Sequence, residues 1–523
     1  MPDAAVLTRD AVPVEAKAPQ RRRPGRWDAA WIAVLAGVVG AAGASRPSLW
    51  FDEAATVSAA QRPLDELARL LGNIDAVHGL YYLVMHGWLN VFPPTEFWLR
   101  LPSCLAVAGA AAGVVLLARQ LSTRAVAVCA GVVFALLPRV TWAAIEARPY
   151  AMAMLLAVWL TVFVVAALRR NRWWLWLLYP LLLASAVLMN MFVALTVIAF
   201  PVLAAVVGAR RWARCWLVVT TVAAAGALVP FALFARTQIR QVGWITPPGG
   251  KTVGEVAVEQ YFDNSLPFAV TAGALLVGAA LCWRLVPRPP GDRPAGLAVF
   301  AIAWAAAPTL VMVVYSVVGD PVYYPRYLTF TAPAMALLLG VCLATVAPAR
   351  GPVLALIAAL ALAAAPNFVV VQRGPYAKEE MDFSAVADVI DAGAAPGDCL
   401  LLDNTTDWLP GPIRPLTAAR PDTYRTLVDP ARGRTARARN MLWDSHIPVW
   451  NVTRRIAGCP TVWLVSERDL TQPDHAAGAS LPAGPRLAKA PAYGVAQQLG
   501  FRIVERWQFS FAQVVKAVPS GGR

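Results

Sequence analysis

The sequence predicts an α-helical polytopic membrane protein that carries a small α/β domain after its last span. Of the 523 residues, 58% are hydrophobic and 15% are charged. Soluble domains carry about 25% charged residues, so lipid is expected to solvate most of this chain. Apolar residues are gathered in long runs as far as residue 371, and shorter, more polar stretches follow from residue 373 onward.

About eleven apolar runs approach the ~20 residues that a membrane-spanning helix needs. The expected spans cover residues 27–45, 101–119, 124–140, 150–168, 173–188, 190–208, 215–235, 266–284, 296–318, 327–346 and 352–371. A tight turn near Asn190 separates two of these runs, and merging them would change the parity of the count. An odd number of spans places the two ends of the chain on opposite sides of the membrane.

The run from Gly79 to Phe92 decides which way the later spans point. At about 14 residues it is too short to cross, so we expect it to lie in the membrane interface. With that placement, the arginine clusters between later spans all face the cytoplasm, as the positive-inside rule requires. These clusters are Arg169–Arg170–Arg172, Arg210–Arg211–Arg214, Arg284–Arg288–Arg293 and Arg350.

This topology divides the chain into three parts in the plasma (inner) membrane. Residues 1–26 are polar and basic, and we expect them to be disordered and cytoplasmic. Residues 27–372 form the transmembrane domain, with a first outer loop at 46–99, and residues 373–523 form an extracytoplasmic domain. Ala42-Gly43-Ala44 is similar to a signal-peptidase site, but the later spans need this first anchor, so we expect no cleavage.

The outer domain is predicted to combine helices with buried strands. Residues 382–390 have the pattern of a helix, and residues 399–403 and 461–465 have the pattern of buried strands. Residues 501–504 form a weaker third strand. The part as a whole is typical of a small α/β fold.

The net charge and the cysteines limit which ligands and cross-links are expected. The formal net charge of +15 could suggest nucleic acid, but the arginines are dispersed between apolar runs, so no nucleic-acid partner is expected. Five of the seven cysteines lie in apolar runs and are typical of small core residues. Cys399 and Cys459 lie in the outer part and could form a disulfide there. No Cys/His spacing of the metal-binding type occurs in the sequence.

Polar residues gather on the predicted outer face. Adjacent carboxylates beside a bilayer are costly, so Asp52 and Glu53 either cap the helix that follows or belong to a site. Residues 62–71 have the pattern of an interfacial amphipathic helix. The aromatic residues of this loop, Trp50 among them, are expected to form an interfacial belt. The further candidates are Asp75, His78, Tyr82, Arg100, Glu146, Arg148, Tyr150, Arg326 and Tyr327.

The arginines and the histidine each have two interpretations. An arginine beside a span often extends to lipid headgroups. Arg100, Arg148 and Arg326, however, lie opposite a carboxylate-rich loop, which suggests an anionic substrate headgroup because the guanidinium fork fits phosphate. His78 is either an interfacial histidine bonded to a neighbour, or a metal or phosphate ligand alongside Asp75.

Four motifs occur in order along the chain. They are Trp50-Phe51-Asp52-Glu53, Arg100-Leu101-Pro102-Ser103, Glu146-Ala147-Arg148-Pro149-Tyr150 and Arg326-Tyr327. With these motifs the chain resembles the GT-C superfamily of membrane glycosyltransferases over residues 27–340. More narrowly, it is similar to the bacterial protein-mannosyltransferase-like members of family 39 (PMT_2 type). His78-Gly79-Leu80-Tyr81-Tyr82 resembles actinobacterial members.

The resemblance implies a GT-C fold and transfer of a sugar from a polyprenyl-phosphate donor to a cell-envelope acceptor, with inversion. Mannose is the sugar that the narrower family suggests; the acceptor is a glycolipid, polysaccharide or protein. Phosphate is already a good leaving group, so such a site needs one general base and cations rather than two acid/base carboxylates.

The resemblance also implies roles for individual residues. Asp52 would be the general base, with Glu53 beside it as a second catalytic candidate. The donor phosphate would be bound by Arg148, Arg326, Tyr327 and Arg100. The sugar or the acceptor would be bound by Asp75, His78, Glu146, Tyr150 and Tyr82. No cofactor is certain, although Asp75 and His78 could hold a divalent metal.

Two alternatives are weighed against this interpretation. An arabinofuranosyl or other sugar transferase of the same fold is the nearest. A transporter or flippase for a lipid-linked sugar comes from another class, but transporters place ionisable residues at mid-bilayer, and these runs hold almost none.

Overall fold

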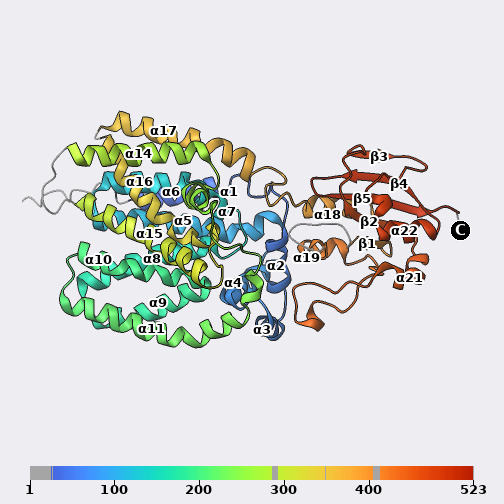
Figure 1. The fold of residues 1–523 in the computed structure, drawn as a ribbon, viewed down its shortest axis with the longest axis horizontal. Helices are drawn as coiled ribbons and strands as arrows, with labels where there is room; N and C mark the ends of the chain where they lie inside the picture. Colours follow the sequence, from blue (N-terminus) through green and yellow to red (C-terminus); the bar gives the residue numbers. More distant parts are fainter. Residues whose placement is uncertain (1–24, 26, 286–292, 348, 404–412, 522–523) are drawn as a thin grey trace, which may run out of the picture.

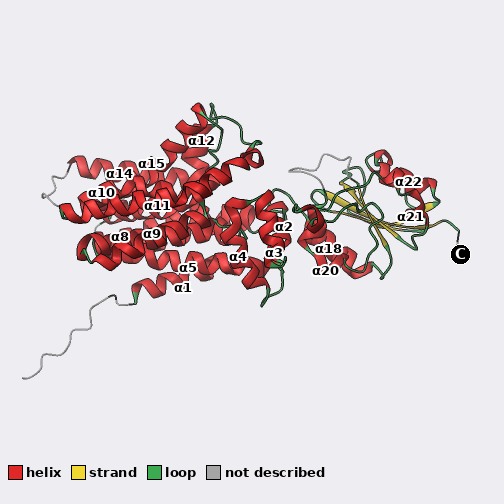
Figure 2. Ribbon diagram, turned by 90° about the horizontal axis from the view of Figure 1, so that it is seen from below, coloured by secondary structure: helices red, strands yellow, loops and turns green. Residues whose placement is uncertain are grey.

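The protein is a bundle of long helices with a sheet-containing domain attached at one end (Figure 1). The computed structural model describes residues 25, 27–285, 293–347, 349–403 and 413–521. Three short helices lie between the bundle and the sheet domain (Figures 1 and 2). They are α2 (Phe51–Ala60), α3 (Leu64–Asn73) and α4 (Gly79–Leu89). This arrangement confirms the predicted fold class. The basic segment 1–26, apart from Gly25, and Arg288 lie outside the described residues.

Seven helices within the described ranges are long and apolar enough to cross a membrane. They are α5 (Glu96–Leu121), α8 (Tyr150–Arg170), α11 (Arg211–Thr237), α14 (Leu266–Leu285), α15 (Arg293–Val318), η5 with α16 (Pro325–Val346) and α17 with η6 (Arg350–Gln372). The pair α6 (Arg124–Leu136) and α7 (Pro138–Ala144) would be an eighth span, bent by 59°. Pro138 explains the bend, because proline forces the preceding residue, Leu137, out of helical backbone geometry.

Three further apolar helices are shorter than a span requires. They are α1 (Asp28–Ala41), α9 (Trp173–Met189) and the continuous η2 and α10 (Met191–Val206). Every predicted span is thus helical, but the length expected of a full span is present in only seven of them, or eight with the bent pair. The predicted turn near Asn190 is present: its backbone is extended, and its side chain accepts a hydrogen bond from Phe192 N (3.0 Å).

The short outer helices match their predicted patterns. α4 has 11 residues, too few to span a bilayer. In α3, Pro63 stands at the N-cap, Leu67 and Leu70 are buried, and Leu64 remains exposed. The other short elements are η1 (Ala76–His78), η3 (Ile239–Val242), α12 (Thr252–Gly254), η4 (Glu255–Glu259) and α13 (Gln260–Phe262).

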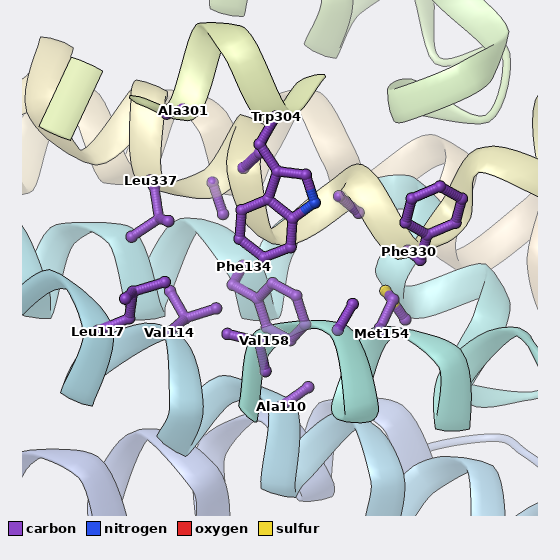
Figure 3. Packing of buried hydrophobic residues seen from close by; sticks show 14 of the residues in the cluster. Ala110, Val114, Leu117, Phe134, Met154, Val158, Ala301, Trp304, Phe330 and Leu337 are labelled. Atoms are coloured by element: carbon purple, nitrogen blue, oxygen red, sulfur yellow. The ribbon is translucent and has the colours of Figure 1, made fainter. Parts of the chain in front are cut away.

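The bundle core is packed from small side chains around a few large ones. Phe134 and Trp304 are fully buried within it (Figure 3). Gly340 of α16 lies directly against Ala130 of α6, and a Cβ atom on Gly340 would come within 2.6 Å of the Ala130 backbone nitrogen. Lipid offers no hydrophobic drive for helix association, so close backbone approach of this kind supplies much of the packing energy.

The outer domain contains a five-stranded sheet with the order β1-β2-β5-β4-β3. The strands are β1 (Cys399–Leu402), β2 (Val462–Glu467), β3 (His475–Ala477), β4 (Phe501–Gln508) and β5 (Ala512–Pro519). β1 pairs with β2 in parallel and the remaining pairs are antiparallel. Helices α18 (Phe383–Gly393), α19 (Pro415–Ala419), α20 (Pro421–Tyr424), α21 (Thr453–Ala457) and α22 (Pro491–Gln498) complete it. The three predicted strands are confirmed as β1, β2 and β4.

A disulfide joins Cys399 and Cys459, whose Cα atoms lie 5.7 Å apart. Cys399 begins β1 and Cys459 precedes β2, so the disulfide links the two parallel strands at one end. The predicted pairing is therefore present. Cross-links of this kind persist in oxidising compartments.

The outer domain is hydrogen-bonded to the loop that precedes α2. Ser384 N donates to Ser48 Oγ (2.9 Å), and Ser384 Oγ accepts from Leu49 N (2.9 Å). Ser384 Oγ also donates to Glu96 Oε1 (2.5 Å), at the start of α5. Arg420 of the outer domain forms an ion pair with the same Glu96. The start of α2 is thus held between bundle and outer domain.

Candidate active site

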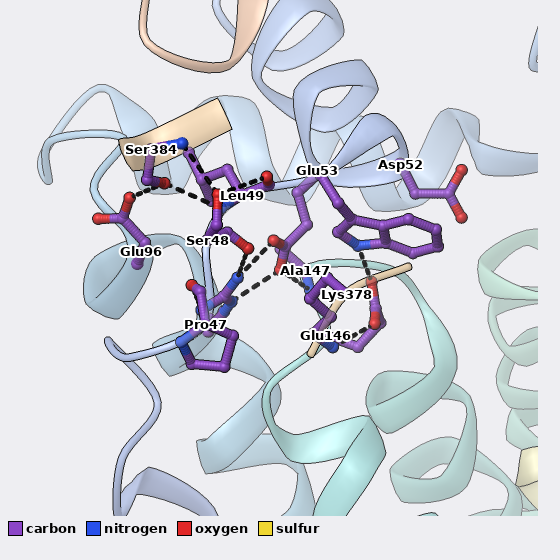
Figure 4. Close-up of polar contacts among 12 residues, drawn as sticks. Pro47, Ser48, Leu49, Asp52, Glu53, Glu96, Glu146, Ala147, Lys378 and Ser384 are labelled. Atoms are coloured by element: carbon purple, nitrogen blue, oxygen red, sulfur yellow. Dashed lines mark hydrogen bonds and ion pairs between the residues drawn. The ribbon is translucent and has the colours of Figure 1, made fainter. Parts of the chain in front are cut away.

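The two carboxylates in the first turn of α2 have different surroundings. Figure 4 shows the Asp52 carboxylate turned away from the polar cluster around Glu53. Asp52 Oδ2 lies 3.9 Å from Arg148 Nε and 3.9 Å from Arg326 Nη2, and its side chain is 18% exposed. The first turn also suits a carboxylate because of the helix dipole. Side chains from three separate segments of the chain therefore meet at Asp52.

Glu53 and Arg100 form a buried ion pair. The Glu53 carboxylate accepts from Arg100 Nε (2.8 Å) and Nη2 (2.6 Å), and both side chains are fully buried. Arg100 also donates to the carbonyls of Ala44, Pro47 and Ser48. The pair ties α5 to the chain that leads into α2. The structure does not bring either side chain to the cavity described below, where the predicted catalytic and phosphate-binding roles would place them.

Glu146 is also a positioning residue. Its carboxylate accepts from Trp50 Nε1 (2.8 Å) and from Lys378 Nζ (2.5 Å) (Figure 4). Burial raises the pKa of Glu146, and the Lys378 ammonium opposes that shift. Lys378 lies in the segment that leads into the outer domain, so Glu146 connects this segment to the residue preceding α2. The predicted contact of Glu146 with sugar or acceptor has no counterpart in this geometry.

A cavity of about 660 Å³ adjoins Asp52. Its polar wall contains Asp52, Asp75, His78, Arg148, Tyr150, Arg326 and Tyr327. Much of the remaining lining is apolar and comes from bundle helices, for example Leu195 of η2, Ala232 of α11 and Val311 of α15. Such a cavity suits an amphipathic ligand with an anionic head and an apolar tail.

Arg148 organises the polar wall. Its Nη1 donates to the Tyr82 hydroxyl (3.0 Å), which donates to Asp75 Oδ2 (2.7 Å). Its Nη2 lies 2.8 Å from His78 Nε2. Burial and the nearby Arg148 cation lower the pKa of His78 well below its usual range, so His78 is a neutral acceptor here. Burial raises the pKa of Asp75.

Arg326 is enclosed by aromatic rings. Its Cζ atom lies 4.8 Å from the ring centre of Tyr324, 5.5 Å from that of Trp50 and 5.8 Å from that of Trp244. Cation–π contacts of this kind hold a guanidinium in place without neutralising it. The Nε atoms of Arg326 and Arg148 are both buried and, among the described residues, have no hydrogen-bond partner. One of these two N–H donors, Arg148 Nε, lies 3.9 Å from Asp52 Oδ2.

The metal hypothesis for Asp75 and His78 does not fit this geometry. In the described part of the chain, no group of three or more His, Cys, Asp or Glu residues is placed to hold a metal ion. His78 Nε2 faces the Arg148 guanidinium at 2.8 Å, and Asp75 Oδ2 already accepts from Tyr82. A cation next to Arg148 would be repelled, so no chemistry is assigned to a metal here.

The sequence alone did not identify the loop that carries Trp244, or the ring of aromatic side chains around Arg326. Gln241 Oε1 accepts from Asp75 N (3.2 Å) and Gln238 Oε1 from Ala76 N (2.9 Å), across sequence separations of 166 and 162 residues. No motif marks contacts between segments so far apart. The expectation of an interfacial belt is too narrow for Trp50, which is 3% exposed and bonded to Glu146.

These features define a class: a multi-pass membrane protein whose cavity has an anion-binding wall and an apolar remainder. No family model and no curated protein matches the chain. Among solved structures, ArnT from Cupriavidus metallidurans bound to undecaprenyl phosphate matches with a TM-score of 0.54 at 15% identity, covering 96% of this chain and 100% of that one. Its apo state gives a TM-score of 0.55 at 15% identity, covering 94% and 99%. The chain therefore has the GT-C membrane fold.

A weaker likeness is found to the archaeal oligosaccharyltransferase AglB from Archaeoglobus fulgidus in complex with an inhibitory peptide and a dolichol-phosphate. Its TM-score is 0.42 at 12% identity, covering 84% of this chain and 69% of that one. This likeness is too low to support an argument. The narrower assignment to family 39 and to an actinobacterial source stays a prediction.

Proposed function

We propose that the protein is a glycosyltransferase that moves a sugar from a polyprenyl-phosphate donor to a cell-envelope acceptor. The observation that carries this proposal is Asp52 between Arg148 and Arg326, each 3.9 Å away, on the wall of a largely apolar cavity. A general base and two cations in one place are what this reaction needs. The undecaprenyl phosphate bound to ArnT supports a lipid-phosphate donor.

The proposed reaction balances as a single displacement. Asp52 accepts the proton of an acceptor hydroxyl as its oxygen forms a bond to the anomeric carbon. The bond from that carbon to the donor phosphate oxygen breaks, and polyprenyl phosphate leaves with the electron pair. Attack opposite the leaving group inverts the anomeric configuration. The free Nε donors of Arg148 and Arg326 would stabilise the negative charge that develops on the phosphate.

The other wall residues have supporting roles in this proposal. Tyr150 and Tyr327 line the cavity and would contact the sugar or the phosphate. Asp75, His78 and Tyr82 would position Arg148 through the hydrogen bonds described above. The apolar lining would receive the first isoprene units of the carrier, because burying them there removes apolar surface from water.

We further propose mannose as the transferred sugar, with arabinofuranose as the variant to test beside it. The end of the bundle that bears the outer domain would face the outside of the plasma membrane. The disulfide between Cys399 and Cys459 supports this orientation, since such bonds form outside the cytosol.

The decisive experiment compares Asp52→Asn with wild type in a transfer assay. Membranes that hold equal amounts of each protein receive radiolabelled polyprenyl-phosphate mannose, then the arabinose analogue. Loss of a positioned general base should lower the rate by roughly 10²–10⁴-fold. Asp65→Asn is the matched control, because Asp65 is 68% exposed and its ion pair, with Arg69, lies on the surface of α3. Equal transfer by Asp52→Asn and wild type would remove Asp52 from the mechanism.

A further inference from the structure

A second cavity, of about 450 Å³, lies between α2 and the outer domain. Ser58, Gln61 and Arg62 line it from the membrane side, and residues of the outer domain line the rest. Leu442 and Trp443 line both this cavity and the one at Asp52, so the two share a wall.

The walls of the second cavity are rich in arginine. The arginines are Arg62, Arg414, Arg425, Arg432 and Arg437. Four of them have a carboxylate partner within the described residues: Asp429 for Arg414, Asp422 for Arg425, Asp444 for Arg432 and Glu66 for Arg437. Arg432 and Arg437 are more than half exposed, so these surface pairs can exchange partners at little cost.

Arg62 differs from the other four arginines. It is 2% exposed, and its hydrogen bonds go to the Ser58 carbonyl (3.0 Å), the Ser58 hydroxyl (3.4 Å) and the Met441 carbonyl, with no carboxylate among its described partners. Its Nη1 atom is buried and has no hydrogen-bond partner in the described part of the chain. Burial and repulsion from Arg437 lower the pKa of Arg62. The Glu66 and Asp444 carboxylates act on Arg62 from nearby and oppose this shift, but neither is bonded to it among the described contacts. A buried guanidinium without a bonded carboxylate is costly, and a bound anion would offset that cost.

Two other lining residues carry buried donors that have no hydrogen-bond partner among the residues the structure describes. These atoms are the Tyr424 hydroxyl and Arg414 Nε. Hydroxyl and amide groups of Ser58, Gln61, Thr417 and Thr435 are also on the wall. The wall also holds two carboxylates, Asp429 and Asp444, which pair with Arg414 and Arg432, so its five arginines outnumber its acids. This mixture of excess cations, hydroxyls and one indole, Trp443, suits an anionic carbohydrate better than an apolar chain.

We propose that the second cavity binds an anionic group, a phosphate or a carboxylate, on the acceptor glycan. This inference rests on the proposed function, because it identifies the acceptor class for that reaction. Arg62 and Arg432 bind the anion, and the shared wall at Trp443 places the neighbouring sugar hydroxyl next to Asp52. The donor phosphate remains with Arg148 and Arg326 on the other side of that wall.

The test is ligand binding to the full-length protein in neutral detergent. The probes are mannose 6-phosphate and glucuronate, with mannose and inorganic phosphate as comparisons. We expect both anionic sugars to bind at least about tenfold more tightly than mannose, and Arg432→Gln and Arg62→Gln each to weaken them by about tenfold, as loss of a charge-assisted hydrogen bond would. Arg454→Gln is the matched control, because Arg454 is exposed on α21 and lines neither cavity.

Four outcomes would overturn the proposal. Anionic sugars that bind no better than mannose would show that no anion site exists. Binding that neither Arg432→Gln nor Arg62→Gln weakens would place the probe elsewhere, for example at Arg148. Inorganic phosphate as tight as mannose 6-phosphate would mean an anion site without glycan recognition. Loss of probe binding in nanodiscs of phosphatidylglycerol, but not of phosphatidylcholine, would make a lipid headgroup the occupant.

The binding measurement does not depend on sugar transfer. A protein that transfers sugar but binds no anionic probe would reject this site and leave the enzyme proposal standing. A protein that binds the probes but transfers no sugar would reject the enzyme proposal instead.

Discussion

At the scale of single residues, burial separates the roles of two adjacent carboxylates. Glu53 is fully buried, and both of its oxygens are engaged by Arg100. Asp52, one position earlier, is partly exposed on a cavity wall and lies 3.9 Å from each of two guanidinium nitrogens. Of the two carboxylates, only Asp52 lines the cavity, and this is why the proposed role of general base falls to Asp52.

The variant Glu53→Gln should destabilise the protein more than Asp52→Asn, because the Asp52 carboxylate is partly exposed and lies 3.9 Å from its arginine partners. Removing one partner of a buried ion pair leaves the other charge uncompensated and costs about 3–5 kcal/mol. Thermal unfolding in detergent should therefore show a lower midpoint for Glu53→Gln than for Asp52→Asn. A midpoint for Glu53→Gln equal to that of wild type would contradict the structural role of the pair.

The sequence was sufficient to nominate the residues of the polar wall but not to sort them. Motif and topology placed Asp52, Arg148 and Arg326 on one face, and the structure brings them together. Neither the motifs nor the predicted topology distinguish a residue that lines a cavity from one that is buried in an internal ion pair. Glu53 and Arg100 form such a pair. That distinction depends on side-chain contacts across 47 residues of chain.

At the scale of elements, helix contacts in the bundle depend on residues without side chains. Gly340 lets α16 approach the backbone of α6 at Ala130. Gly273 of α14, by contrast, has nothing within 4 Å of the position where a Cβ would stand. The two glycines lie in apolar helices of similar sequence character and differ in what faces them.

The variant Gly340→Ala should destabilise the bundle, and Gly273→Ala should not. The added methyl group of Gly340→Ala meets backbone atoms that cannot rotate away, and overpacking of this kind costs about 1–3 kcal/mol. Gly273→Ala fills open space and should be neutral or slightly stabilising, because alanine favours helix over glycine. Urea or SDS titration of both variants measures the difference. Equal destabilisation would show that the contact between α6 and α16 is looser than described.

Element existence was predicted well and element length poorly. Apolar composition marks every helix of the bundle, but the ends of α1 and α9 are decided by local breaks such as the turn at Asn190. In the outer domain, β3 and β5 were not predicted. β3 has three residues, and β5 derives its burial from pairing with β2 and β4, which the sequence of β5 alone does not reveal.

At the scale of the whole molecule, one buried carboxylate makes the stability of the outer domain depend on pH. Asp382, at the start of α18, accepts from the backbone amides of Phe511 (2.8 Å) and Ala512 (2.7 Å). Despite these bonds, burial raises its pKa to about 6. The native state therefore prefers the protonated carboxyl, whose contribution to stability is complete below the unfolded pKa of about 4 and is lost as the pH rises through about 6.

Asp382→Asn should flatten this pH dependence. The amide has the shape of the protonated acid and cannot ionise, so wild type should lose about 3 kcal/mol relative to this variant between pH 4 and pH 7. Thermal midpoints of both proteins, measured side by side across that range, test the difference. Parallel curves would mean that Asp382 does not titrate between these values.

The hydrogen bonds and the ion pair that hold the start of α2 against the outer domain also have a consequence for biosynthesis. Ser48 and Glu96 belong to the first outer loop and the helix after it, but their partners Ser384 and Arg420 belong to the outer domain. Those partners leave the ribosome only after every membrane helix has been made. A nascent chain can therefore be fully inserted while α2 still lacks its final anchor. The loop that carries Asp52 therefore reaches its final position only after the last segment of the chain has folded.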